Sequence, residues 1–503
     1  MTKKSKVLVN SFFYTFSALL VKAISLLILP VYTFFLTPED YGIINLVSSF
    51  TGVATFIVAF SIYSAVIRFY ADYKDDREKL KRFYGTVIIF TFISGTIFIS
   101  LGMIFKSTLI SWFFEGISFY PDVLIVLLTL NFVSLHSIHQ SILQGMQQGK
   151  KLTIINLVVF GIQVCLNLLL IAFFKLGASG VLLATFIINI TYVLYMLIDL
   201  KKNNLVKYCI DMTLLGETLK YSVPLIPHNL STNIASFASR VFMNYSGSLS
   251  LVGLYSVAFQ FGALIDTVQT SVNKAFQPWF YNIMNCQGKE NKTDVVSFSR
   301  FLLIVYSLMY MGIGLFSQEV IILMTNDRYT MAWTIIPILV VAFSVKSIYY
   351  FYVNVLFYHK DAARKIFIAT IIGSFADIVF AYKLVPKYGM YGAAVAFLLA
   401  KTIIVSIIVF MSKRYDDIGY KVSSMLRIII PGLLFMGGGL YFSYTKYITE
   451  ICWMNLFYKI AIVCVYMIFI YLTNKKMINT IIRSGKLKQI LKEKSGLDGQ
   501  RCL

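Results

Sequence analysis

The chain has 503 residues, of which 58% are hydrophobic and only 14% are charged, and its mean hydropathy is +0.75. Charged residues make up about a quarter of an ordinary soluble protein, so this composition excludes a soluble globular domain. The formal net charge of +22 does not indicate a nucleic-acid partner, because the basic residues are dispersed over many short segments between apolar runs.

Apolar residues occur in runs of about 20, the length at which an α-helix spans the hydrocarbon core of a bilayer. The sequence lacks the segments of about 10 residues with alternating polarity that build membrane β-barrels. We therefore predict an all-α polytopic membrane protein with about fourteen transmembrane helices. The predicted spans are 9–35, 41–66, 83–105, 121–148, 152–174, 178–200, 217–244, 251–276, 296–316, 333–357, 364–385, 389–411, 424–445 and 456–474.

Basic residues are unevenly distributed between alternate connecting segments. Lys and Arg are frequent in segment 68–82 and in the tail from Lys475 onward, whereas the facing loop 37–40 contains neither. Because cytoplasmic loops are enriched in Lys and Arg, we expect the N- and C-termini to lie in the cytoplasm, with an even number of spans between them.

The two halves of the sequence resemble each other. Tyr41–Phe50 reappears as Val252–Phe261, and Lys175–Gly180 reappears as Lys387–Gly392. Many transporters build a substrate path between two such repeats, so we expect two six-helix lobes around a central cavity. The expected parts are an N-lobe at 1–208, a C-lobe at 209–415, two appended helices at 416–474 and a basic cytoplasmic tail at 475–503.

Several segments carry a resemblance to a known family. They are the opening Asn-Ser-Phe at 10–12, Pro-Val-Tyr at 30–32, segment 36–42, and the paired lobe-end segments 177–180 and 389–392. With these segments and its two-lobe organisation, the chain resembles the multidrug/oligosaccharidyl-lipid/polysaccharide (MOP) exporter superfamily, which has the MATE-like fold. Within it, the chain is similar to the Wzx-type polysaccharide flippases.

This resemblance implies a function. Such a protein moves an undecaprenyl-diphosphate-linked oligosaccharide repeat unit, of O-antigen, capsule or exopolysaccharide, from the cytoplasmic to the outer leaflet of the bacterial inner membrane by alternating access. It is a transporter and no enzyme, and the polysaccharide polymerase machinery is an expected partner. The resemblance identifies no particular sugar.

Charged residues inside the spans are candidates for the site, because each costs about 2.5 kcal/mol or more unless it faces a wet cavity or a partner. The excess of cations among them suits a diphosphate or an acidic sugar. Lys22 is near the middle of its span, too far from either surface to reach it easily. The predicted substrate-binding residues are Lys22, Arg240, Lys274, Lys346 and Lys401.

These cations have alternative interpretations. Arg240 and Lys274 lie near span ends, where a long side chain can reach the interface. Lys346 and Lys401 are alternatively partners in ion pairs between helices. Asp266 and Lys274 are separated by about two helical turns, so they are either pathway residues or a charge pair.

Asp377 suggests ion coupling, because a buried carboxylate can exchange a proton or bind Na⁺ as a transporter changes conformation. Thr232 and Asn233 would supply further oxygen ligands if the seventh and eleventh spans touch, and Asp266 is a further ion-coupling candidate. The alternative for Asp377 is a structural ion pair with a lysine. No cofactor or bound metal is expected. For His136 and His139 we favour interhelical hydrogen bonding over metal binding.

Three other functions remain as alternatives. A polymerase or ligase acting on the same lipid carrier would need a long outward catalytic loop, and the predicted outward loops are short. A cation-coupled multidrug exporter of the same fold would favour an acidic interior, whereas the charged residues of these spans are mainly basic. A flippase for the peptidoglycan-precursor lipid shares both the fold and the diphosphate headgroup with a polysaccharide flippase.

Overall fold

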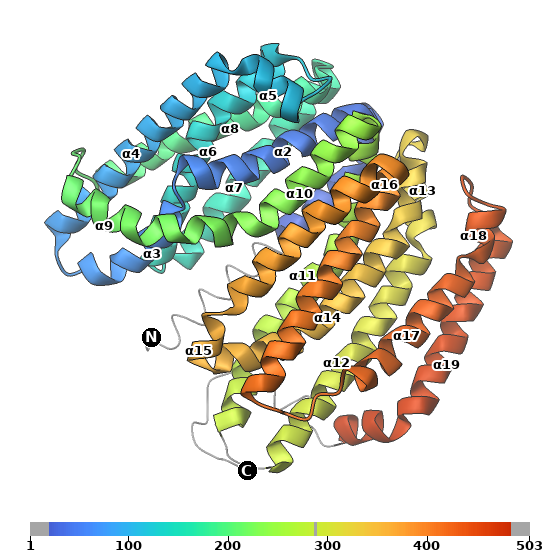
Figure 1. The fold of residues 1–503 in the computed structure, drawn as a ribbon. Coiled ribbons are helices and arrows are strands. Elements are labelled where there is room, and N and C mark those ends of the chain that lie inside the picture. The colour runs from blue at the N-terminus through green and yellow to red at the C-terminus, as the bar shows by residue number, and fades with distance from the viewer. Residues whose placement is uncertain (1–19, 286–288, 484–503) are drawn as a thin grey trace. The chain divides into compact units, whose positions relative to one another are not determined.

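The structure is a computed structural model, and it describes residues 20–285 and 289–483 (Figure 1). Within these residues the chain forms helices joined by short turns, which confirms the predicted all-α class. It divides into two compact units, residues 1–253 and 254–503. The beginning of the first predicted span and most of the predicted basic tail lie outside the described residues.

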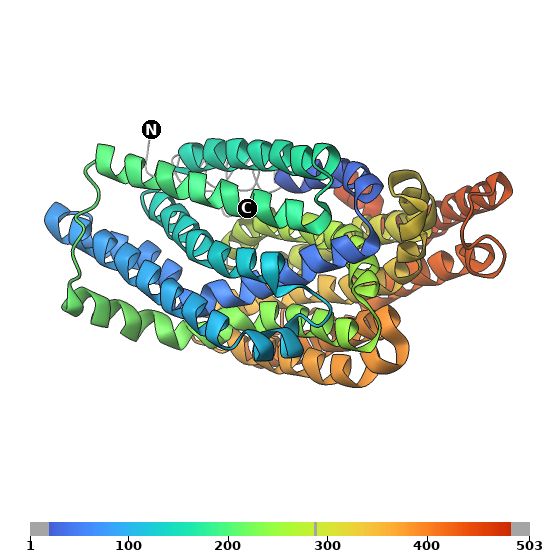
Figure 2. The ribbon, with the colours of Figure 1, turned by 90° about the horizontal axis from the view of Figure 1, so that it is seen from above.

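The first unit is a set of helices that run along one another in both views (Figures 1 and 2). Its helices are Leu20–Phe35, α2 Pro38–Val58, α3 Ile62–Tyr73, α4 Arg77–Ile104, α5 Lys106–Phe113, α6 Leu124–Gly145, α7 Gly149–Leu168, α8 Gly177–Lys202, α9 Met212–Ser222 and α10 Ile226–Ser246. Short π-helical turns at Phe119–Val123 and Leu169–Phe173 precede α6 and follow α7.

The second unit contains most of α11, which begins in the first unit, and all later elements. These are α11 Leu249–Asn285, α12 Lys289–Leu315, α13 Ser317–Met324, the 3₁₀ helix η4 Asp327–Ile335, α14 Ile336–Tyr358, α15 Lys360–Ala363, α16 Ile366–Tyr415, α17 Val422–Gly439, α18 Tyr441–Thr445 and α19 Trp453–Arg483. α14 packs along α16, and α17 and α19 pack on each other and on α12.

The predicted spans fall on these helices. Eleven described helices are long and apolar enough to cross a membrane, and Leu20–Phe35 is a shorter apolar helix. α16 covers two predicted spans, 364–385 and 389–411, which meet at a non-helical Gly389 with φ 52°. The seventh predicted span is not one helix, because a 3₁₀ turn at Val223–Leu225 separates α9 from α10. Pro224 and Pro227 explain this break, since proline cannot donate the hydrogen bond that continues a helix.

The turn before α2 has a clear local cause. Thr37 and Asp40 form a capping box, in which the Thr37 hydroxyl accepts from the Asp40 amide at 3.1 Å and Asp40 Oδ2 accepts from the Thr37 amide at 3.0 Å. Pro38 occupies the first helical turn, where a missing amide hydrogen does no harm. Asp40 Oδ1 also accepts from the amide of Ala178 at 3.1 Å. One carboxylate therefore starts α2 and ties it to the start of α8.

Apolar packing holds each unit together. In the first unit, α3, α4, α6 and α8 contribute buried side chains to one core, among them Phe83, Ile138 and Met196. In the second unit, the fully buried Lys459 of α19 donates to both carboxylate oxygens of Glu319 on α13, at 2.7 and 2.9 Å. This ion pair fixes the last predicted span to α13, the short helix that follows α12.

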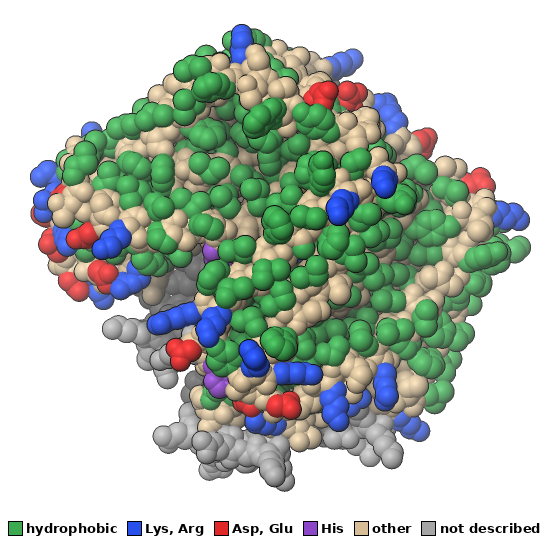
Figure 3. Space-filling view, in the orientation of Figure 1, with side chains coloured by type: hydrophobic (Ala, Val, Ile, Leu, Met, Phe, Trp, Pro, Cys, Tyr) green, Lys and Arg blue, Asp and Glu red, His purple; other side chains and the backbone are tan. Residues whose placement is uncertain are grey.

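The surface has the character of a membrane protein. On the face shown in Figure 3, apolar side chains cover the middle of the helices, and charged side chains gather mostly toward helix ends in each unit. Large apolar side chains such as Phe375, Leu434 and Leu472 are more than 60% exposed. Such exposure is favourable only where lipid replaces water.

Candidate functional site

A cluster of charged side chains lies inside the second unit, on helices that are far apart in the sequence. Lys346 of α14 donates to Asp266 Oδ1 of α11 at 2.6 Å. The Tyr350 hydroxyl donates to the same oxygen at 2.8 Å and lies 2.9 Å from the hydroxyl of Thr270. Both partners of the ion pair keep about a quarter of their side-chain surface exposed, 23% for Lys346 and 29% for Asp266.

The two arms of α16 bring one charge of each sign to this cluster. Asp377 and Lys401 are equally far along the chain from Gly389, on either side of the kink. The Lys401 side chain interacts electrostatically with Asp377, Asp266 and Lys346, and its Nζ lies 4.6 Å from the centre of the Phe397 ring. The kink therefore places the Asp377 carboxylate and the Lys401 ammonium within electrostatic reach of each other.

Asp377 is the most enclosed carboxylate of the cluster. Only 6% of its surface is exposed, and among the described residues its Oδ1 has no hydrogen-bond partner. A buried carboxylate oxygen without a donor is costly. Protonation, a bound cation or a new lysine contact would each relieve that cost.

Helical spacing explains why these side chains share a face. Lys346 and Tyr350 are one turn apart on α14, and Asp266 and Thr270 are one turn apart on α11, so each pair projects from the same side of its helix. The four charged residues of this charge cluster, Asp266, Lys346, Asp377 and Lys401, balance formally. Asp266 forms its ion pair with Lys346 of another helix, and a pair with Lys274 of its own helix was one of two alternatives that the sequence left open.

The structure places the remaining predicted residues elsewhere. Lys22, on helix Leu20–Phe35, and Lys274, on α11, are exposed. Arg240 on α10 is only 8% exposed. It donates to the carbonyl oxygen of Ser236 at 2.9 Å and also to the Ser236 hydroxyl.

The predicted oxygen ligands for a coupling ion are on α10. Asn233 donates to the carbonyl of Asn229 at 3.4 Å. Thr232 belongs to the same helix, and its side chain lies outside the described part of the chain. Both residues are in the first unit, whereas Asp377 is in the second. The joint ion site remains a prediction.

A second polar network lies in the first unit and was only partly predicted. His139 of α6 lies 2.9 Å from the Tyr192 hydroxyl and 3.3 Å from Asp199 Oδ2, both on α8. Lys151 of α7 donates to both oxygens of Asp199 at 2.7 Å. His136 makes a similar interhelical contact to Asn189 at 2.9 Å. The expected hydrogen bonding of both histidines is confirmed, whereas sequence reasoning missed Lys151 and Asp199, which it placed at span ends.

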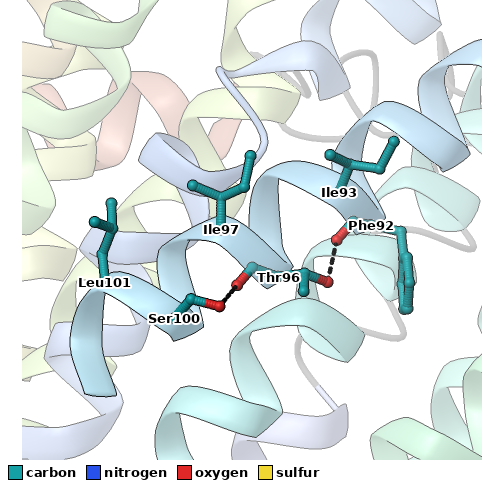
Figure 4. A pocket seen from close by; sticks show the side chains of 6 residues that line it. All are labelled: Phe92, Ile93, Thr96, Ile97, Ser100 and Leu101. Atoms are coloured by element: carbon teal, nitrogen blue, oxygen red, sulfur yellow. Dashed lines mark hydrogen bonds between the residues drawn. The ribbon is translucent and has the colours of Figure 1, made fainter. Parts of the chain in front are cut away.

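One cavity, of about 340 Å³, lies on the outer face of α4 (Figure 4). Its six lining residues come from α4 alone and are mostly apolar. The hydroxyls of Thr96 and Ser100 donate to carbonyl oxygens of their own helix, at 2.8 and 2.9 Å. Because these polar groups are already engaged, this surface suits lipid chains better than a polar substrate.

Three solved structures with a similar fold are two transporters and a lipid flippase. An inward-facing multidrug resistance MATE family transporter of the MOP superfamily has 15% identity and a TM-score of 0.65, with coverage of 79% of this chain and 94% of that one. The Lipid II flippase MurJ, in an inward closed conformation, has 18% identity and a TM-score of 0.66, with coverage of 93% and 99%. A MOP superfamily transporter from Pyrococcus furiosus, whose binding pocket is described as having reverse polarity, has 16% identity and a TM-score of 0.56, with coverage of 84% and 100%.

These likenesses and the described helices define a multi-pass helical membrane protein with the fold of MOP superfamily transporters, as predicted. The chain belongs to the polysaccharide biosynthesis protein family. The sequence pattern of this family matches residues 7–284, which is more than half of the chain. The fold is shared with solved transporters and a lipid flippase. Sequence comparison with curated proteins gives no match.

Proposed function

We propose that this protein is a flippase for undecaprenyl-diphosphate-linked oligosaccharide repeat units of O-antigen, capsule or exopolysaccharide. The observation that carries the proposal is the family match over residues 7–284, which links a transporter fold to polysaccharide biosynthesis. The substrate crosses from the cytoplasmic to the outer leaflet of the bacterial inner membrane. The product is then available to the polysaccharide polymerase machinery, the partner we propose.

Cationic side chains support a diphosphate substrate. Lys22 and the buried Arg240 place positive charge on two helices of the first unit. A phosphate loses its water when it enters a protein, and charge-assisted hydrogen bonds from Lys and Arg replace that hydration. We propose that these two residues contact the diphosphate, and that Lys274, exposed on α11, does so during entry from the cytoplasm.

We further propose that the charge cluster of the second unit couples transport to Na⁺ or H⁺. The unsatisfied oxygen of Asp377 supports this role, because binding of a cation there removes a costly buried charge. Lys401 then loses its electrostatic partner, and the Lys346–Asp266 pair is the alternative partner within reach. A change of partners between α11, α14 and α16 is a physical means of coupling ion binding to helix movement.

A flippase for the peptidoglycan-precursor lipid is the second candidate. It is favoured by the likeness to the Lipid II flippase MurJ, which covers 93% of this chain. Both substrates carry a diphosphate, so the contacts proposed above do not separate them. A cation-coupled multidrug exporter has the same fold, but Lys22 and Arg240 would repel cationic drugs.

Deletion of the gene separates these functions. We expect cells without the protein to remain viable, to lose surface polysaccharide, and to accumulate undecaprenyl-diphosphate-linked repeat units, measured by mass spectrometry of extracted lipids. Accumulation of the peptidoglycan-precursor lipid, with lysis, would favour the second candidate. Unchanged lipid intermediates together with increased drug sensitivity would contradict both lipid functions.

A further inference from the structure

A cavity of about 590 Å³ opens at the start of α7, beside α8, in the first unit. It is lined by the first-turn residues Lys150 and Lys151, by Gln148 before them, and by Ile154 and Tyr195. None of the described residues that line it is acidic. The cavity is separate from the charge cluster, which lies in the other unit.

The electrostatics of this cavity favour an anion. Lys151 donates to both carboxylate oxygens of Asp199, so the two charges of this pair cancel formally. Lys150 is exposed and adds a positive charge. The cavity also lies at the N-terminus of a 20-residue helix that has no acidic residue in its first turn and no side-chain cap from Gln148. The positive end of the helix dipole therefore adds to the charge of Lys150.

The other half of the cavity is apolar and faces outward. Ile154 is 51% exposed and Tyr195 is 40% exposed, on helices long and apolar enough to span a membrane. Lys150 and Ile154 are one helical turn apart, so the cation and the apolar side chain share one face of α7. A cationic end next to an exposed apolar stretch matches the border between lipid headgroups and acyl chains.

We propose that this cavity binds the headgroup of an anionic phospholipid, with its phosphate at Lys150 and the first turn of α7 and its acyl chain along Ile154. Free phosphate would use the cation but leave the apolar half unoccupied, so a lipid fits the whole cavity. By the predicted topology this end of α7 is at the cytoplasmic leaflet, where anionic lipids attract basic residues. The proposal does not depend on which substrate the protein transports.

Lipid titration of the full-length protein tests the proposal. Purified protein in neutral detergent is titrated with short-chain phosphatidylglycerol, and bound lipid is counted by native mass spectrometry. Short-chain phosphatidylcholine and inorganic phosphate are the comparison ligands. The main variant is Lys150→Gln, which keeps the Lys151–Asp199 pair, and its matched control is Lys201→Gln, an exposed lysine in the last turn of α8.

We expect saturable binding of phosphatidylglycerol that Lys150→Gln weakens about fivefold, the effect of one lysine near an anionic headgroup. Lys201→Gln should bind as the wild type does, and Ile154→Ser should weaken lipid binding without affecting any binding of phosphate. Thermal unfolding of each variant checks that it is folded. Equal binding by Lys150→Gln and wild type, equal losses in both lysine variants, or tighter binding of phosphate than of phosphatidylglycerol would each overturn the proposal.

Discussion

The carboxylate of Asp266 shows what a partly buried charge requires inside a membrane protein. It accepts from Lys346 and from Tyr350, each on α14, while Lys401 adds a longer-range attraction. Removal of one cation leaves the carboxylate partly desolvated and uncompensated, whereas removal of both charges leaves an apolar contact.

We therefore predict that Lys346→Met lowers the free energy of unfolding by about 2 kcal/mol, less than for a fully buried pair because both groups keep some exposure. The double variant Lys346→Met/Asp266→Leu should recover at least half of that loss. Denaturant unfolding in detergent measures both. Additive losses in the double variant would show that the pair does not act as a unit.

Lys22 provides the functional prediction for a single residue. If its charge contacts the diphosphate, Lys22→Arg should retain export of surface polysaccharide. Lys22→Gln should reduce export about tenfold, because it loses a charge-assisted hydrogen bond, and Lys22→Glu should abolish it by repulsion. Lys106→Gln, at an exposed lysine of α5, is the control. Equal export by Lys22→Gln and wild type at matched membrane abundance would remove Lys22 from the mechanism.

Individual charges were predictable from the sequence, but their partners were not. Asp266, Lys346, Asp377 and Lys401 were all identified because a charge within an apolar run is rare and costly. Their grouping depends on how α11, α14 and α16 pack, and apolar periodicity does not specify which helices are neighbours. The spacing of Asp266 and Lys274 left a pair on one helix as one of two alternatives, and tertiary packing supplied Lys346 as the partner.

Among the helices, the kink of α16 depends on one backbone position. Gly389 has φ 52° and ψ −129°, a backbone conformation that residues other than glycine avoid. Its place between Asp377 and Lys401 means that the kink also sets the separation of these two charges.

We predict that Gly389→Ala lowers the free energy of unfolding by about 1 to 3 kcal/mol, the cost of strained backbone. Gly437→Ala is the matched control, because that glycine is helical and an added Cβ meets no atom within 4 Å. The control should be neutral or slightly stabilising. Thermal unfolding in detergent compares the two, and equal stability of both variants would mean that the kink tolerates a side chain.

Helix positions were more predictable than helix breaks. Apolar runs located the spans because each span must cover the bilayer core. The break between α9 and α10 had a signal in Pro224 and Pro227 that the continuous apolar pattern outweighed. The break between α2 and α3 had no comparable signal, since Phe60 and Ser61 adopt positive φ values of 48° and 54° without being glycine.

The topology of the whole protein is testable with reporter fusions. Fusions at Asp40, Gly247 and Asn326 should report an outward location. Fusions at Asp75, Lys289, Asp416 and the C-terminus should report a cytoplasmic location. The physical reason is the enrichment of Lys and Arg in the second set of segments. Termini on opposite sides of the membrane would contradict the even number of spans and the two-lobe organisation predicted from the repeat.

The internal repeat and the compact units describe different properties of the chain. The repeat predicts a lobe boundary near residue 208, and the compact units divide at Gly253 because α9 and α10 pack with α2, α3 and α4. Sequence similarity follows ancestry, whereas contacts follow packing. The division at Gly253 therefore does not test the lobe boundary near residue 208, which stays a prediction.

The most direct test of the proposed function is transport by the purified protein. Vesicles containing an undecaprenyl-diphosphate-linked oligosaccharide are prepared with and without the protein, and a lectin added outside measures how much sugar becomes accessible after the outer leaflet has been trimmed enzymatically. We predict renewed accessibility only in vesicles with the protein, accelerated by a proton or sodium gradient and slowed by Asp377→Asn. Equal accessibility in vesicles with and without the protein would contradict its function as a flippase for this lipid.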